Sequence, residues 1–227
     1  MTSRLSQLTS HLTYPRGLLA NQVAIITGGG QGIGAETATL FANEGAKVVI
    51  ADVDHDKATQ TATKINSAGA GDRALAVVGD ILDDNYLETL VQRAAEFGDG
   101  KIHIIVNNAG FTWDGVIHKI TDKQWDTMLA IHNTAPFKLV RAAAKYFRVK
   151  DGEPRCIINI SSTSGLHGNA YVLSFFSFLF FSLHCPTPAM PCLCYSNKMG
   201  TPDQSLRLCL RLCLRLWIWI WIWIWTG

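Results

Sequence analysis

Short apolar runs alternate with amphipathic segments along residues 21–170. Five runs are almost wholly apolar, as in strands buried on both faces of a parallel sheet: 23–26, 47–51, 74–78, 103–106 and 156–160. Four segments between them have helical spacing of apolar positions: from the glycines near 34 to about 45, 57–68, 83–97 and 122–147. This alternation predicts an α/β fold, a doubly wound, Rossmann-like parallel sheet that stops after its fifth strand.

The longest of these helices contains two informative polar positions. Thr121 and Gln124 have the spacing of a capping box, which predicts that the helix begins there. Pro136 has no N–H to donate to the carbonyl of His132, so we expect a kink at this point. Asn133 lies beside the kink, where a polar side chain can replace the missing hydrogen bond.

The last quarter of the chain has a different composition. Residues 171–183 are rich in phenylalanine, three prolines follow, arginine recurs every four residues from Arg207, and residues 217–225 alternate Trp and Ile. Such simple alternation suggests translated repetitive nucleotide sequence, from a retained intron or a frameshift. A membrane-surface segment and an interaction module are the alternatives. Neither apolar run reaches the ~20 residues of a spanning helix, so we expect no spanning segment.

These patterns divide the chain into three parts. We predict an N-terminal arm over residues 1–20, a dinucleotide-binding Rossmann domain over 21–170, and an aberrant, hydrophobic, irregular tail of low complexity over 171–227.

Composition adds few further constraints. The net charge of +2 gives no reason to propose nucleic-acid binding. Five of six cysteines lie in the last quarter, which favours a reducing compartment without a disulfide framework. Cys192 and Cys194 have poor metal-site spacing, so we predict no metal site. We expect a cytoplasmic protein. A mitochondrial location is the alternative, because the first acidic residue is Glu36 and the preceding segment loosely fits a transit peptide.

The glycine-rich segment 27–34 stands between the first strand and the first helix. Glycines allow the main chain to approach a pyrophosphate, whose charge the N-terminus of the helix favours. This context predicts a phosphate-binding turn, although a glycine turn without a ligand is the alternative. The candidate binding residues of this segment are Gly28, Gly30, Gln31, Gly32, Ile33 and Gly34.

Asp52 follows the second strand, about 20 residues after the glycines. At this place a carboxylate accepts hydrogen bonds from the ribose hydroxyls of a dinucleotide. The same carboxylate would repel a 2′-phosphate, so the sequence favours NAD, with NADP as the alternative cofactor. A solvated turn aspartate is the competing interpretation.

Taken together, the glycine segment, Asp52, Asp80, Asn107-Asn108-Ala109-Gly110, Asn133 and Ile160-Ser161-Ser162 resemble the short-chain dehydrogenase/reductase family. The resemblance covers about residues 20–170, and within the family it is strongest to 3-oxoacyl-[acyl-carrier-protein] reductases and their 3-hydroxyacyl dehydrogenase relatives. It implies that Gly28, Gly32 and Gly34 line the pyrophosphate turn.

The resemblance assigns further roles. It implies that Asp80 and Ile81 border the adenine, and that Asn107, followed by Ala109 and Gly110, steadies the central strand under the cofactor. It also implies that Asn133 holds an active-site water, and that Ser162 binds the substrate carbonyl oxygen. Ser162 and Asn133 are therefore the candidate catalytic residues, and the remaining residues are candidates for cofactor binding.

The implied function is hydride transfer between a nicotinamide dinucleotide and a 3-oxo- or 3-hydroxyacyl thioester, or a related ketone or secondary alcohol. The family's proton donor is a tyrosine with a lysine four residues later. At the usual spacing from Ser162 this chain has Phe175 and Leu179, neither of which can transfer a proton. The alternative is a catalytically dead dinucleotide-binding fragment from a mis-spliced or frameshifted gene model. The family is usually homo-oligomeric, but its packing helix is missing here.

Overall fold

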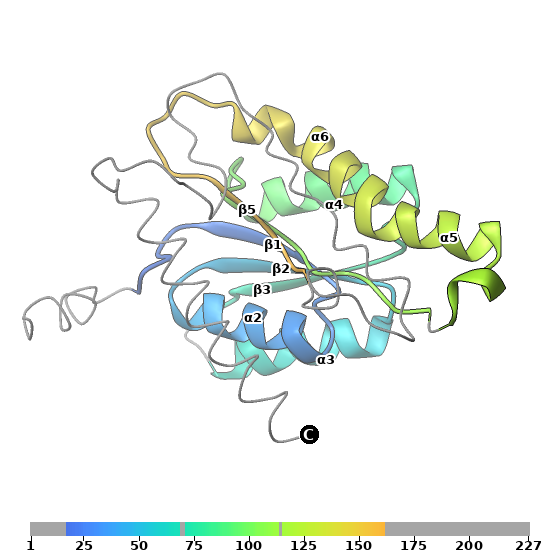
Figure 1. The fold of residues 1–227 in the computed structure, drawn as a ribbon. Coiled ribbons are helices and arrows are strands. Elements are labelled where there is room, and N and C mark those ends of the chain that lie inside the picture. The colour runs from blue at the N-terminus through green and yellow to red at the C-terminus, as the bar shows by residue number, and fades with distance from the viewer. Residues whose placement is uncertain (1–16, 69–70, 114, 162–227) are drawn as a thin grey trace, which may run out of the picture.

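The computed structural model describes residues 17–68, 71–113 and 115–161. Five parallel strands form one sheet in the order β3-β2-β1-β4-β5 (Figure 1). The strands are β1 (Val23–Thr27), β2 (Lys47–Asp52), β3 (Ala74–Val78), β4 (Ile104–Asn107) and β5 (Cys156–Asn159). The predicted doubly wound parallel sheet is confirmed, and its order reverses between β1 and β4.

Helices cover both faces of this sheet. Figure 1 shows α2 (Gly32–Asn43) and α3 (His55–Ala68) on one face, and α4 (Asp84–Phe97), α5 (Asp122–Leu129) and α6 (Ala135–Phe147) on the other. Phe41 and Ile65 pack with Ile26 on the first face, and Leu90 and Leu139 pack with strand residues on the second. The central strand β1 is buried at all five positions, which explains its unbroken apolar run.

The helix predicted over 122–147 is interrupted, as expected from Pro136. Thr121 and Gln124 form the predicted capping box at its start. A π-helical turn, Ala130–Thr134, separates α5 from α6. The N–H of Ala135 reaches back to the carbonyl of Ala130, five residues earlier, instead of four. Pro136, which has no N–H to donate to the His132 carbonyl, follows this bond directly.

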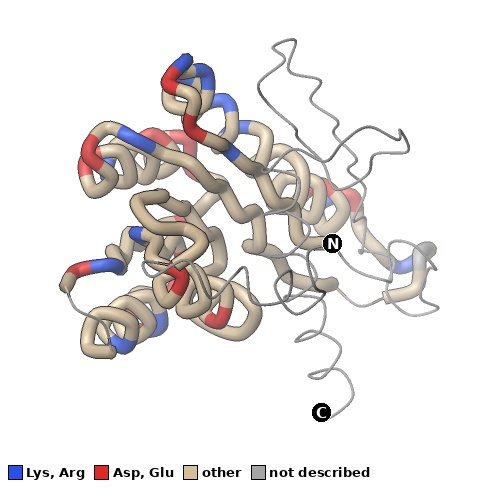
Figure 2. The backbone as a smooth tube through the Cα atoms, turned by 90° about the vertical axis from the view of Figure 1, so that its left-hand side faces the viewer, with Lys and Arg blue, Asp and Glu red and all other residues tan. Residues whose placement is uncertain are grey.

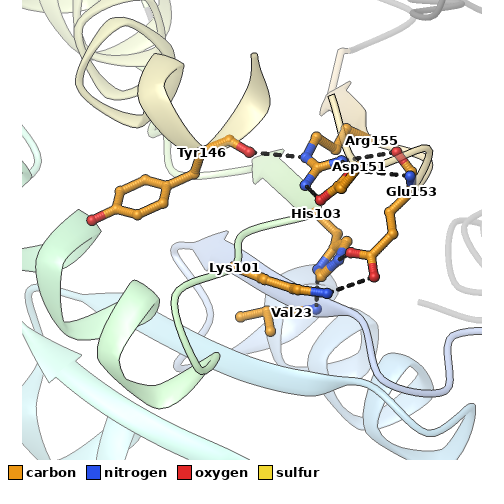
Figure 3. A network of polar contacts seen from close by, with 7 residues as sticks. All are labelled: Val23, Lys101, His103, Tyr146, Asp151, Glu153 and Arg155. Atoms are coloured by element: carbon orange, nitrogen blue, oxygen red, sulfur yellow. Dashed lines mark hydrogen bonds and ion pairs between the residues drawn. The ribbon is translucent and has the colours of Figure 1, made fainter. Parts of the chain in front are cut away.

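A polar network closes the opposite, amino end of the sheet (Figure 3). The buried His103 accepts a hydrogen bond at Nδ1 from the Val23 N–H (3.0 Å) and donates from Nε2 to Glu153 (2.8 Å). Lys101 pairs with the other oxygen of Glu153. Arg155 donates to both carboxylate oxygens of Asp151. These contacts fix the segment that leads into β5 against β1 and β4.

Charged residues are spread over the surface helices, and the first described residues pack against the core. Figure 2 shows acidic and basic residues interspersed on the helical layers. Within the described ranges, no helix is long and apolar enough to cross a membrane. Leu19, inside the segment predicted as an arm, is buried against the core. The tail predicted over 171–227 lies outside the described residues, and the cytoplasmic location stays a prediction.

Candidate functional site

The carboxyl ends of β1, β2 and β4 meet at the edge where the strand order reverses. Thr27 of β1 is in register with Ala51 of β2, and the Gly29 N–H donates to the Ala51 carbonyl (3.3 Å). On the other side, a Cβ on Gly28 would lie 2.9 Å from the Cα of Ala109. Doubly wound sheets bind their ligands at this switch point, so the predicted glycine turn stands where a dinucleotide would cross.

The turn between β1 and α2 uses its glycines for two separate purposes. Gly28 and Gly32 have φ values of +62° and +53°, in the left-handed region that favours glycine. A Cβ on Gly34 would overlap the carbonyl oxygen of Gly28, so this glycine allows the helix to start against the turn. A Cβ on Gly32 would meet nothing within 4 Å, which leaves open space beside the N-terminus of the helix.

The N-terminus of α2 can receive an anion. Gln31 provides no side-chain cap, and the first turn contains no acidic residue. In the part of the chain that the structure describes, no group accepts a hydrogen bond from the N–H groups of Gly32, Ile33 and Gly34. These donors and the helix dipole match what a pyrophosphate needs, so the residues fit the phosphate portion of a dinucleotide.

Asn108 holds the glycine turn in place. Its side-chain amide donates to the carbonyls of Thr27 (2.9 Å) and Gly28 (3.1 Å). The Thr27 hydroxyl in return accepts from the N–H groups of Asn108 and Ala109, both at 3.0 Å. With the bond from the Thr27 hydroxyl to the Val106 carbonyl (3.3 Å), five hydrogen bonds join the ends of β1 and β4. No sequence pattern assigned a role to Thr27 or to the side chain of Asn108.

Asp52 faces the glycine turn from the end of β2. Its Oδ2 accepts from the Gly30 N–H at 2.8 Å, and its Oδ1 accepts from the Asp54 N–H at 3.0 Å. Each carboxylate oxygen has a second lone pair, so both can still accept a hydroxyl. The half-buried carboxylate fits the ribose of an adenosine, and its charge opposes a 2′-phosphate.

Asp80 and Ile81 lie beside Asp52, at the end of β3. The Gly79 N–H donates to the Asp52 carbonyl (3.0 Å), which joins the two strand ends. Tyr86 packs its ring against Gly79 and donates its hydroxyl to the Val77 carbonyl (2.6 Å). Burial raises the pKa of Tyr86, and the charges of Asp52 and Asp80 raise it further, so the phenol stays a hydrogen-bond donor. Sequence analysis missed this support.

Asn107 connects β4 to β5 below the edge. Its amide nitrogen donates to Oδ1 of Asn159 at 2.8 Å. Its own Oδ1 is buried and, among the described residues, has no hydrogen-bond partner. A side chain that holds two strand ends together agrees with the steadying role implied by the resemblance. That role stays a prediction.

His132, in the π-helical turn, packs against Gly110, three residues after the end of β4. The His132 Nδ1 donates to the Met128 carbonyl at 3.0 Å, and a Cβ on Gly110 would lie 2.5 Å from Nε2. Burial lowers the pKa of His132, and the hydrogen bond to Met128 opposes this only in part. Asn133 is half-buried in the same turn. The candidate catalytic role of Asn133 stays a prediction, and that of Ser162 falls outside the described residues.

The structure therefore brings the predicted residues of the glycine turn to one edge together with Asp52, Asp80, Ile81, Asn107, Ala109 and Gly110. Residues 17–68, 71–113 and 115–161 contain no group of three or more metal-ligating side chains. Sequence signals for the missed residues were weak, because Thr27, Tyr86 and His132 act through contacts that only the strand order and the π-helical turn create.

Comparison with known proteins agrees with this arrangement. The family model described as "short chain dehydrogenase" matches residues 22–176. A hydroxyacyl-CoA dehydrogenase, ChsB1, of Mycobacterium tuberculosis is 37% identical over 159 residues, covering 66% of this chain and 50% of that protein. A peroxisomal hydratase-dehydrogenase-epimerase of Neurospora crassa is 35% identical, over 65% of this chain and 15% of that protein.

A solved structure shows the same fold. The crystal structure of a short chain dehydrogenase from Mycobacterium smegmatis superposes with a TM-score of 0.65 and 32% identity, covering 70% of this chain and 65% of the other. The chain spans about half the length of the curated relatives ChsB1 and an uncharacterized Thermotoga maritima oxidoreductase, with 50% and 56% of their lengths covered.

Proposed function

The chain belongs to the short-chain dehydrogenase family, and from this premise we propose that its carboxyl edge binds NAD for hydride transfer to and from acyl thioesters. The observation that supports the cofactor best is the pair of features at the start of α2 and the end of β2. The N–H groups of Gly32–Gly34, which have no acceptor among the described residues, suit the pyrophosphate, and the Asp52 carboxylate suits an unphosphorylated adenosine ribose.

Each residue of this edge has a defined task in the proposal. Because Gly28 and Gly34 have no side chain, a pyrophosphate can approach the main chain of the turn. Asp52 accepts the ribose hydroxyls while it holds Gly30 in place. Asn108 and Thr27 keep the turn attached to β4, so that both halves of the cofactor meet one rigid surface. When bound, the nicotinamide ring donates or accepts the hydride.

The proposed substrate is a 3-oxo- or 3-hydroxyacyl thioester. Relatives named as a hydroxyacyl-CoA dehydrogenase and as a hydratase-dehydrogenase-epimerase support this substrate class. In the proposal, the hydroxyl of Ser162, three residues after the end of β5, donates a hydrogen bond to the substrate carbonyl oxygen. A related ketone or secondary alcohol presents the same oxygen to the same donor.

A second candidate function is dinucleotide binding without turnover. It is favoured by Phe175 and Leu179, which occupy the positions where the family resemblance expects the tyrosine and lysine of the proton transfer. An apolar side chain at each place supplies neither a proton nor the charge that lowers a phenol pKa. The described residues that would hold the adenosine ribose and the pyrophosphate, Asp52 and the glycine turn, are present in this chain.

One experiment with two steps tests both functions. The purified full chain is titrated with NADH, followed by the fluorescence of the dihydronicotinamide, and NADH oxidation is then followed with acetoacetyl-CoA. Saturable binding with oxidation above the uncatalysed rate supports the oxidoreductase. Saturable binding without oxidation supports the second candidate, and a folded chain that binds no NADH contradicts both.

A further inference from the structure

A histidine whose Nε2 has no hydrogen-bond partner among the described residues lies at the β4 side of the proposed nucleotide site. His132 belongs to the π-helical turn Ala130–Thr134, which directs its ring at Gly110. Because a Cβ on Gly110 would lie only 2.5 Å from Nε2, the absence of a side chain there is what allows the imidazole to reach the main chain. The ring of Phe111 stands 6.3 Å from that of His132, centre to centre.

The hydrogen bond of Nδ1 fixes the chemistry of the ring. The Met128 carbonyl can only accept, so Nδ1 holds the proton and donates to it at 3.0 Å. In the neutral imidazole Nε2 is then an acceptor. Across the described segments, no residue donates a hydrogen bond to Nε2. The imidazole is half-buried, and burial lowers its pKa, which keeps this acceptor unprotonated near neutral pH.

The strand order decides which part of a dinucleotide would meet this atom. Asp52, at the end of β2, lies on one side of β1, and Gly110, just after β4, lies on the other. A dinucleotide with its adenosine ribose at Asp52 and its pyrophosphate at the N-terminus of α2 extends toward β4 with its other half. The nicotinamide half, with its ribose hydroxyls and carboxamide N–H groups, therefore reaches the His132 side.

We propose that His132 is a cofactor-binding residue whose Nε2 accepts a hydrogen bond from the nicotinamide nucleoside of NAD. This inference rests on the proposed nucleotide site. It concerns a side chain to which no sequence pattern assigned a role, next to Asn133 in the same π-helical turn.

Binding measurements with whole and partial ligands test the inference. NADH, ADP-ribose and ADP are titrated against the full wild-type chain and against His132→Ala, His132→Phe and His132→Gln. His132→Ala and His132→Phe both remove the acceptor but differ in side-chain volume, so these two loss variants show whether volume alone causes an effect. His132→Gln retains an acceptor near the Nε2 position. His118→Gln, a change at an exposed histidine of the described chain, is the matched control. Thermal unfolding identifies the variants that fold.

The expected pattern is selective. His132→Ala and His132→Phe weaken NADH about tenfold, the size of one hydrogen bond left unmade, and leave ADP affinity unchanged. His132→Gln restores NADH affinity to within about threefold of the wild type. If the loss variants weaken ADP-ribose as much as NADH, the hydrogen-bond donor is a ribose hydroxyl. If they leave ADP-ribose affinity unchanged, as for ADP, the donor is the carboxamide. Either result supports the inference.

Other outcomes overturn it. An unchanged NADH affinity in both loss variants, or an equal loss for NADH and ADP, contradicts the inference while the nucleotide site stands. A glutamine variant that binds NADH as weakly as the alanine variant also contradicts it. A folded wild-type chain that binds neither NADH nor ADP contradicts the proposed function itself, and the two failures are therefore distinguishable.

Discussion

Replacing Asp52 with asparagine should reduce the discrimination between NAD and NADP. The substitution keeps the shape of the side chain and removes its charge. Asp52 is half-buried and accepts N–H groups from Gly30 and Asp54, so its carboxylate is held at the end of β2 next to the proposed ribose position. In the proposal, the negative charge of this carboxylate is what makes the affinity for NADP lower than the affinity for NAD.

The expected size follows from Coulomb's law. A 2′-phosphate has a charge of about −1.5 to −2 near neutral pH. At ~4 Å each pair of unit charges interacts with about 1 kcal/mol in water and more where the site is partly shielded. The carboxylate therefore disfavours NADP by at least about 2 kcal/mol, or roughly 30-fold in affinity. We expect the affinity ratio of NADH to NADPH to fall by about this factor in Asp52→Asn.

The assay compares fluorescence titrations with NADH and NADPH for wild type, Asp52→Asn and Asp72→Asn. Asp72 is exposed and precedes β3, at the opposite edge of the sheet, so its substitution makes the same change in net charge away from the site. Because the asparagine amide turns a donor toward one of the two N–H groups, Asp52→Asn should also lose about 1–3 kcal/mol of stability. An unchanged NADH/NADPH ratio in a folded Asp52→Asn would refute the placement of this carboxylate at the ribose.

Three further predictions concern the surroundings of the site. Gly34→Ala introduces a methyl group that overlaps the Gly28 carbonyl, and the overpacking should cost about 1–3 kcal/mol in denaturant unfolding and weaken NADH binding. Gly152→Ala strains a backbone at φ +75° but adds a methyl group that meets nothing within 4 Å, so it should lower stability and leave NADH affinity unchanged. Tyr86→Phe removes the donor to the Val77 carbonyl and should lower the free energy of unfolding by about 1 kcal/mol; equal stability of the two proteins would argue against this hydrogen bond. Hydrogen bonds from Lys101 and, second in size, from His103 hold the pKa of Glu153 below its ordinary value. The unfolded chain therefore binds more protons, and the free energy of unfolding should fall as pH drops below about 4.5. Glu153→Gln should reduce this dependence in unfolding experiments at several pH values.

Helices and strands were predictable from the sequence where a short stretch of residues determines them. The apolar run of β1 is buried on both sides, and the capping box at Thr121 starts α5 at the expected residue. The kink at Pro136 followed from its missing N–H, although its form, a π-helical turn, did not. β4 begins at Ile104, one residue later than expected, although the main chain of His103 still bonds to Val23 of β1 and Cys156 of β5.

The candidate site was predictable at the main-chain level and less so at the side-chain level. The glycine turn and Asp52 follow from spacing along a strand, a turn and a helix. Asn108 and Thr27 meet only because β1 and β4, far apart in sequence, become neighbours. His132, in the π-helical turn, lies against Gly110, a contact between distant segments that apolar periodicity does not reveal.

Direct measurement of NADH binding by the purified full chain tests the central claim, that the carboxyl edge of this sheet is a nicotinamide dinucleotide site. Calorimetric titration should give saturable binding of one NADH per chain, with ADP competing for the same site. A chain that unfolds cooperatively on heating, and is therefore folded, yet takes up neither NADH nor ADP would contradict the claim.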